Sequence, residues 1–175
     1  MKNGENRGIL IQVSGEKEES PTEKKGIKIA AQNRKAFHDY FVEDRYEAGI
    51  ELFGTEVKSI RAGTLNLKDA YCTVKDGELF VHGMHISPYE KGNIFNKDPV
   101  RTRRLLMHKR EIRKLHALIK QDGYTLVPLS VYFKDARVKV EVGLCKGKKN
   151  YDKRESTAQR DAKREIDRTM KERNR

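Results

Sequence analysis

The sequence predicts a mainly β protein in which a small β-barrel is packed with two or three helices. The apolar segments are several and short, and two of them flank Asp76-Gly77, a dipeptide that is typical of tight hairpin turns. Two helical patterns interrupt these strands. A barrel is the expected closure because a closed sheet leaves no exposed edge.

Charge and apolar content divide the chain into three stretches. Residues 1–26 carry five basic and five acidic side chains and few apolar ones, which predicts a disordered leader. Residues 27–145 hold the apolar segments and form the predicted barrel domain. Residues 146–175 carry twelve basic and six acidic side chains, with an apolar stripe too narrow for a core. We expect this basic tail to be unstructured alone and helical when bound to a partner that neutralises it.

The first half of the barrel domain shows a strand, a helix and a hairpin in that order. A strand pattern runs from Phe37 to Leu52, with a bend expected near Gly49. The segment GTEVKSIRAG then predicts a helix of about two turns, which Thr55 can cap and Gly63 ends. AYCTV and ELFVHGM predict the hairpin around Asp76-Gly77.

The second half shows a longer helix and another hairpin. Asp98-Pro99 suits an N-cap followed by proline at the first helical position, and apolar residues recur at helical spacing from Leu105 to Ile119. Asp122-Gly123 stops this pattern. TLVPLSVYF and RVKVEVGL then predict a hairpin around Lys134-Asp135.

The composition favours a polyanionic partner inside the cell. Lys and Arg number 38 against 26 Asp and Glu, a net charge of +12, which suits RNA, DNA or anionic lipid. Apolar runs are too short to cross a bilayer, and the first residues do not read as a signal peptide. Cys72 and Cys145 lack metal-ligand spacing and are expected to be buried thiols in a reducing compartment. We therefore predict a cytoplasmic protein.

The sequence contains no recognisable catalytic or metal-binding constellation. Its five histidines are scattered, and no G-x-S-x-G, P-loop or H-E-x-x-H motif occurs. Glu47 and Glu51 lie four residues apart on a predicted strand, where such a pair is more often solvated than catalytic. We expect neither enzymatic activity nor a cofactor or metal.

Basic residues cluster in three places. RTRRLLMHKREIRKLHALIK contains eight basic residues and the single acid Glu111. RVKVEV places Arg137, Lys139 and Glu141 on one strand face, and KGKKNYDKRE surrounds Tyr151, an aromatic residue able to stack on a base. A solubility tail or loose polyanion binding fits the last cluster nearly as well. Because Lys and Arg bind phosphate without reading bases, composition does not separate RNA from DNA.

Three long segments, in the right order, resemble the small protein B family, also called SsrA-binding proteins. They are NRKAFHDYFVEDRYEAGIELFGTEVKSIRAG, DPVRTRRLLMHKREI and KGKKNYDKRE. The resemblance runs from about Ile27 to the C-terminus. It implies an oligonucleotide-binding-type β-barrel without enzymatic activity, and we expect it to act as a monomer.

The resemblance also implies a partner and a role. The family binds the tRNA-like domain of transfer-messenger RNA, around its elbow and D-loop side, and delivers it to stalled ribosomes for trans-translation. Asn33, Glu47 and Leu106 match residues that the family uses at that RNA surface, and His38 matches a position proposed to face the decoding region. The tail matches a segment that enters the vacant messenger channel and becomes helical there. Tyr151 stands where relatives often have His, which preserves stacking but not protonation.

Two sets of contact residues follow as expectations. The residues expected to bind RNA are Asn33, Arg34, Lys35, His38, Glu47, Lys58, Arg61, Arg103, Arg104, Leu106 and Lys139. The tail residues expected to bind the ribosome are Lys146, Lys148, Lys149, Tyr151, Asp152, Lys153 and Arg154.

Two other functions stay open from composition alone. A structural ribosomal protein with a basic barrel and tail would remain on every ribosome through high-salt washing. An RNA-processing enzyme would cleave labelled RNA, although the sequence lacks an acid–base or metal set for that reaction.

Overall fold

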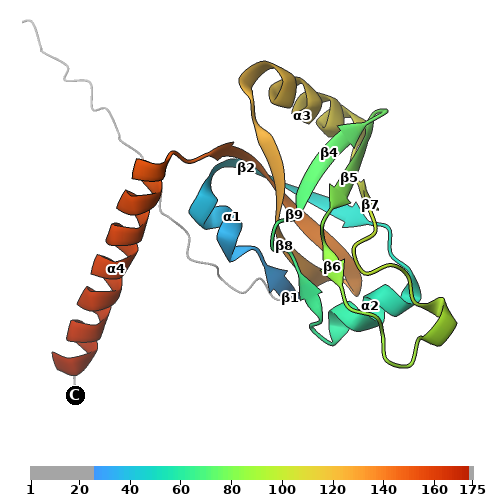
Figure 1. Ribbon diagram of the computed structural model, residues 1–175, viewed down its shortest axis with the longest axis horizontal. Helices are drawn as coiled ribbons and strands as arrows, with labels where there is room; N and C mark the ends of the chain where they lie inside the picture. The colour runs from blue at the N-terminus through green and yellow to red at the C-terminus, as the bar shows by residue number, and fades with distance from the viewer. Residues whose placement is uncertain (1–25, 174–175) are drawn as a thin grey trace, which may run out of the picture.

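The computed structural model describes residues 26–173 as a β-barrel with helices around it and one long helix standing apart (Figure 1). The predicted leader 1–26 lies outside the described residues, except for Gly26. The elements in chain order are β1 (Ile27–Gln32), α1 (Arg34–Asp39), β2 (Tyr40–Ile50), α2 (Gly54–Arg61), β3 (Leu65–Asn66), β4 (Tyr71–Lys75), β5 (Glu78–His82), β6 (His85–Ile86), the 3-10 turn η1 (Asn93–Phe95), β7 (Arg103–Leu106), α3 (Lys109–Asp122), β8 (Thr125–Lys134), β9 (Arg137–Gly147) and α4 (Asn150–Arg173).

Six antiparallel strands close into a ring, which confirms the predicted barrel. The ring runs β8-β4-β5-β7-β2-β9, and β9 pairs again with β8. The long strand β8 pairs with β4 near its start, at Leu126, and with β1 from Ser130 onward. β3 and β6 form a separate two-stranded ladder.

The inward faces of the strands build the main core, and helices cover its two ends. Leu79, Val81, Val131 and Val140 of this core are fully buried. α3 adds Leu115 to this core, whereas Ile60 comes from α2. Figure 1 shows α3 and α2 at opposite ends of the barrel.

A second apolar cluster fixes α1 to the outside of the barrel. It joins Ala36 of α1 to Val127, Leu129 and Cys145 of β8 and β9. A Cβ on Gly143 would lie 2.7 Å from a methyl carbon of Leu129, so a side chain there would displace this buried leucine.

Both cysteines are free and buried, as the sequence predicts. Burial raises the pKa of both thiols, to about 11 for Cys145, so neither is a thiolate at neutral pH.

The start of the predicted Phe37–Leu52 strand is wrong. Phe37, His38 and Asp39 belong to α1, because the Asn33 side chain accepts a hydrogen bond from the Ala36 N–H and begins a helix. β2 begins at Tyr40, and its irregularity lies between Val42 and Asp44, not near Gly49.

The helix over GTEVKSIRAG is confirmed as α2, but its cap differs from the prediction. Thr55 donates to the Phe95 carbonyl oxygen, 3.2 Å away. The Glu56 carboxylate caps instead, accepting from the Phe53 N–H at 2.8 Å. Gly63 has a φ of +78° and ends the turn as expected.

The predicted helix after Asp98-Pro99 begins ten residues too early. Arg103–Leu106 forms β7, which pairs with β2 and β5 and closes the ring, and α3 begins only at Lys109. Arg103 and Leu105 point inward and the residues between and after them point outward, which is strand periodicity. Gly123, with a φ of +66°, ends α3 where the sequence indicates.

β9 continues to Gly147, two residues past the predicted end of the barrel domain, and α4 follows at once. α4 is helical to Arg173. Whether the free tail unfolds in solution stays a prediction. Within residues 26–173, no helix combines the length and the apolar content that a membrane crossing requires.

Candidate nucleic-acid interface

One outward face of the barrel gathers several predicted contact residues. Register places Gly49 of β2 beside Leu106 of β7 on one side and Lys139 of β9 on the other. Glu47 lies two residues before Gly49 on the same strand and therefore on the same face. We call this surface the Glu47–Leu106 face; its outward side chains are Glu47, Leu106, Tyr132, Lys134 and Lys139, with Gly49 between them.

Glu47 is held as a carboxylate on this face. The Tyr132 hydroxyl donates to it at 2.6 Å, and the Lys134 ammonium lies 3.1 Å from the same oxygen. The Tyr132 hydrogen bond lowers the pKa of Glu47, more than burial opposes it, and Lys134 and Lys139 add to the effect. Burial and the Glu47 charge raise the pKa of Tyr132, so its hydroxyl remains a donor. The face thus presents a positioned negative charge among cations.

Gly49 keeps the neighbourhood of Leu106 open. A Cβ at position 49 would lie 3.2 Å from the Leu106 Cβ, closer than most real contacts. Leu106 is 50% exposed although it is a large apolar residue on a strand. A shallow groove runs beside it, lined by Gly49, Ile50, Leu52, Val57, Leu106, Ala136, Arg137, Val138 and Lys139. An exposed leucine beside a glycine offers a flat apolar seat for a base or ribose.

The two arginines of β7 have different roles. Arg104 points outward between Glu51 and Glu78, with nitrogen–oxygen distances of 3.0 and 3.1 Å, and stays 43% exposed. Arg103 points inward and its side chain is fully buried. The expectation that Arg103 contacts RNA is therefore wrong for this fold, because its guanidinium cannot reach a ligand at the surface.

Arg103 belongs to a buried ionic cluster centred on Glu56. Its guanidinium donates to Glu56 at 2.9 Å and to the carbonyl oxygens of Met84, Pro99 and Arg101. Arg101 donates to the same carboxylate at 2.9 and 2.6 Å. Burial raises the pKa of Glu56, but the hydrogen bonds from Arg101 and the Phe53 N–H and the Arg103 charge outweigh it, so the net pKa is lowered. This cluster ties α2 to β7.

Asn33 is also turned inward and supports the fold. Its amide nitrogen donates to the carbonyl oxygens of Leu67 and Pro128, both at 3.1 Å, and its oxygen caps α1 at Ala36. The residue is 5% exposed. Both amide donors are used within the protein, so Asn33 positions α1. Its expected contact with RNA stays a prediction.

The remaining predicted residues of α1 lie at its surface. Arg34 is exposed, and Lys35 pairs with Asp69. His38 is 42% exposed and its Nδ1 lies 2.8 Å from the Asp39 carboxylate. The His38 hydrogen bond lowers the pKa of Asp39 against the opposing effect of burial, and Lys153 of the tail adds to it.

Lys58 and Arg61 extend outward from α2. Lys58 lies 5.3 Å from the centre of the Tyr89 ring, and Arg61 lies 6.0 Å from that of Phe133. Both are exposed and charged. They belong to the α2 end of the barrel and lie outside the Glu47–Leu106 face.

The beginning of the tail is fastened to α1. The Lys148 N–H donates to the Asp39 carbonyl oxygen at 2.9 Å, and its ammonium donates to the Phe37 carbonyl oxygen at 3.3 Å. Lys153 lies 3.5 Å from the Asp39 carboxylate. The Asp152 carboxylate accepts from the Lys149 N–H and so caps α4. The other predicted tail residues, Lys146, Tyr151 and Arg154, are exposed.

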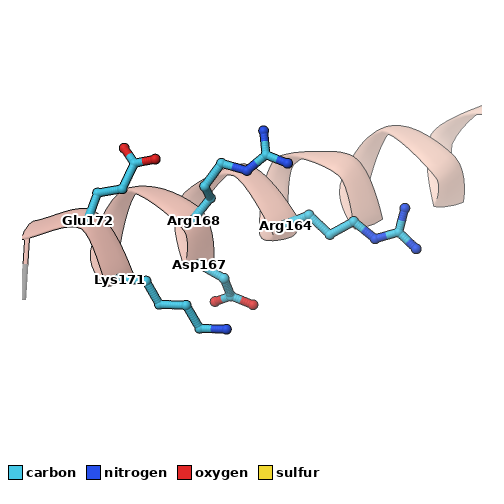
Figure 2. Close-up of a pocket in the computed structure, with 5 residues that line it drawn as sticks. All are labelled: Arg164, Asp167, Arg168, Lys171 and Glu172. Atoms are coloured by element: carbon cyan, nitrogen blue, oxygen red, sulfur yellow. The ribbon is translucent and has the colours of Figure 1, made fainter. Parts of the chain in front are cut away.

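Beyond its first turns, α4 is open to solvent on all sides. Figure 2 shows five charged side chains projecting from its last turns: Arg164, Asp167, Arg168, Lys171 and Glu172. The hollow between them is bounded by one helix alone and forms no ligand cavity. Across the described residues, no group of three His, Cys, Asp or Glu side chains could hold a metal ion.

Sequence reasoning missed Tyr132 and Lys134. They lie on β8, far from Glu47 in the chain, and only the strand register brings the three side chains together. Their outward positions in an alternating strand were the one available signal.

Known proteins resemble this chain over most of its length. The family described as SmpB protein matches residues 30–172. A protein of Acetivibrio thermocellus named SsrA-binding protein is 66% identical over 145 residues, covering 83% of this chain and 94% of its own. One of the same name from Clostridium botulinum (strain Hall) is 62% identical over 154 residues, covering 88% of this chain and 99% of its own.

A solved structure agrees with these relatives. It is described as "tmRNA-SmpB: a journey to the center of the bacterial ribosome" and is 49% identical, with a TM-score of 0.59 over 69% of this chain and 85% of that one. The barrel, the Glu47–Leu106 face and the basic tail occur together in a chain with this likeness, and the chain belongs to the SmpB protein family.

Proposed function

We propose that the chain binds the tRNA-like domain of transfer-messenger RNA and delivers it to stalled ribosomes for trans-translation. The observation that carries this proposal is the Glu47–Leu106 face, in a protein whose relatives are SsrA-binding proteins. Its partners are then one RNA and the ribosome.

The chemistry of the Glu47–Leu106 face suits a folded RNA with unstacked bases. Leu106 can cover a base that has left its stack, and the Glu47 carboxylate can accept from a ribose hydroxyl or an exocyclic amine. Lys134 and Lys139 can meet phosphates on either side. A phosphate placed against Glu47 would be repelled, which favours one register of the RNA on the protein.

The tail supplies the second half of the function. It carries a net charge of +6 and exposes its basic residues along α4. We propose that it occupies the empty messenger channel and that its first turn, beside His38 on α1, lies near the decoding region. Its helix is strengthened there by phosphate contacts.

We also propose that the protein acts by binding and not by catalysis. Its exposed charged residues serve as RNA contacts, and the buried Glu56 and Arg103 neutralise each other. It works as a monomer in the cytoplasm, where its target ribosomes are, and both of its cysteines are free.

Binding of two RNAs to matched variants tests the proposal. Leu106→Ser and Glu47→Gln should each weaken binding to the tRNA-like domain by about 1–3 kcal/mol, which is roughly fivefold to 150-fold. Met170→Ser is the control, because Met170 is 61% exposed but lies at the far end of the tail. Each protein is titrated at one salt concentration against the labelled tRNA-like domain and an unrelated RNA duplex. Equal losses on both RNAs would show that the Glu47–Leu106 face is not a specific site.

A further inference from the structure

A loop at the end of the barrel away from α4 exposes large apolar side chains to an unusual degree. It links β6 to β7 and contains η1, whose Ile94 and Phe95 are 86% and 70% exposed. Phe53, at the start of α2, is 48% exposed. Figure 1 shows this loop beside α2, on the opposite side of the barrel from α4. We call Phe53, Ile94 and Phe95 the apolar tip.

The apolar tip is held by an ordered loop. The Asn96 side chain accepts from the Tyr89 N–H at 3.0 Å and donates to the Tyr89 carbonyl oxygen at 2.9 Å, which closes the loop on itself. A Cβ on Gly92 would overlap the Asn96 side-chain amide, so a larger residue at position 92 would displace this bridge. Thr55 of α2 donates to the Phe95 carbonyl oxygen and fixes the loop to the helix. The exposure of the tip therefore belongs to a defined conformation.

Two cations lie against one aromatic ring of the tip, that of Phe53. The Lys97 ammonium lies 4.9 Å from the centre of the Phe53 ring, and the Arg101 guanidinium lies 4.7 Å from it. Asp98, an acid of the same loop, accepts from the Val100 N–H. The Phe95 ring is left exposed next to this positive charge, which suits a nucleotide whose base stacks on the ring while its phosphate meets a cation.

The tip is also continuous with the Glu47–Leu106 face. The groove beside Leu106 includes Leu52, the residue before Phe53. Phe53 lies six positions after Glu47, a distance of at most about 22 Å along the chain. A single folded RNA is large enough to reach both.

We propose that the apolar tip is a second RNA contact, on which an unpaired base stacks against Phe95 while Lys97 holds its phosphate. This inference deepens the proposed function and rests on it for the choice of RNA. The competing partner is a ribosomal protein that receives the tip in an apolar pocket. The experiment separates this partner from an RNA base.

Tryptophan fluorescence gives the test, because the chain contains no tryptophan. Phe95→Trp in the full chain places a single reporter at the tip, and Tyr71→Trp, at a residue 49% exposed on β4, is the matched control. The probes are the tRNA-like domain of transfer-messenger RNA and the small ribosomal subunit. A base stacked on the indole quenches its emission, whereas burial in an apolar protein pocket shifts the emission to the blue without quenching.

The expected result is quenching of Trp at position 95, and not at position 71, by the tRNA-like domain. Phe95→Ala should then weaken that complex about tenfold or more, while Tyr71→Ala changes it less than twofold. A blue shift without quenching, or unchanged emission with both probes, would overturn the inference. The same samples also contain a labelled tRNA-like domain, whose binding to the protein is measured separately from the tryptophan signal. Absence of this binding would count against the proposed function, whereas normal binding without a change at position 95 would count against the apolar tip alone.

Discussion

Removal of the Glu56 carboxylate should strongly destabilise the barrel. Glu56→Gln keeps the shape of the side chain but removes its negative charge. The carboxylate accepts hydrogen bonds from the Phe53 N–H, Arg101 and Arg103, over 2.6 to 2.9 Å. The amide would turn an NH₂ group toward at least one of these donors. The fully buried Arg103 guanidinium would then lack its counter-charge.

The magnitude follows from burial. Breaking a buried ion pair from one side costs about 3–5 kcal/mol, because an uncompensated charge is left inside the protein. That is a large part of the roughly 5–15 kcal/mol by which domains are stable. Glu51→Gln is the matched control: Glu51 pairs with Arg104, but its side chain is 61% exposed. Exposed pairs contribute about 0–1 kcal/mol, so this variant should unfold almost like the wild type.

Urea unfolding followed by circular dichroism measures both variants. Glu56→Gln should lower the transition midpoint with little change in slope, because the surface exposed on unfolding is similar. Replacing Glu56 and Arg103 together by methionine should recover part of the loss, since no buried charge then remains at position 103. A loss below about 1 kcal/mol for Glu56→Gln would refute the view that this cluster holds α2 to β7.

The same cluster predicts a pH dependence. The folded pKa of Glu56 is lowered from its ordinary 4.5, so the folded state favours the carboxylate. Its contribution is complete above about pH 4.5 and is lost as the pH falls through the lower folded pKa. The difference in stability between wild type and Glu56→Gln should therefore shrink below that pH. A difference that stays constant down to pH 3 would contradict this assignment.

Three further predictions concern α1, the barrel face and the tail. Asn33→Ala should destabilise the barrel domain by about 1–3 kcal/mol, because it leaves two buried carbonyl oxygens without a donor, and it should weaken binding to all RNAs alike. Thermal unfolding and binding to an unrelated duplex check this; a loss of binding confined to the tRNA-like domain would mean that Asn33 reads the RNA. Lys139→Ala should reduce the salt slope of RNA binding by about one unit, and an unchanged slope would exclude a phosphate contact. Replacing both Ala162 and Ile166 by proline should break the interior of α4, because each proline costs about 3 kcal/mol of helix stability. RNA binding should be spared and rescue of stalled ribosomes abolished. Normal rescue would mean that the tail acts as an extended strand.

Much of the fold could be predicted because the local turn and strand patterns in the sequence favour the same elements that the closed barrel requires. Asp76-Gly77 forms the turn between β4 and β5, with positive φ values at both residues. The error at residues 99–108 has a definite cause. Leu105 satisfies helical spacing with Ile112 and strand alternation with Arg103 equally well, and only the need to close the ring between β5 and β2 decides between them.

The candidate site was predictable in part, and its errors share one cause. Glu47, Leu106 and Lys139 could be proposed, but whether a polar side chain faces water depends on strand parity and on distant partners. Arg103 and Asn33 look like surface residues in the sequence, yet both are satisfied by carbonyl oxygens elsewhere in the chain, including those of Met84 and Pro128. Tertiary contacts of this kind leave no local pattern to read.

The attachment of α4 to α1 makes the tail a tethered ligand. α4 has 24 residues and is about 36 Å long, and its first turn is fixed near Asp39 while the rest is free of the barrel. When the barrel domain is docked, the tail searches only the space within that radius, so its target is met at an effective concentration near the millimolar range. Individual contacts of the tail can then be weak and quickly reversible without loss of occupancy. A second consequence is directional, because a pivot at Lys148 points the search to the α1 side of the molecule.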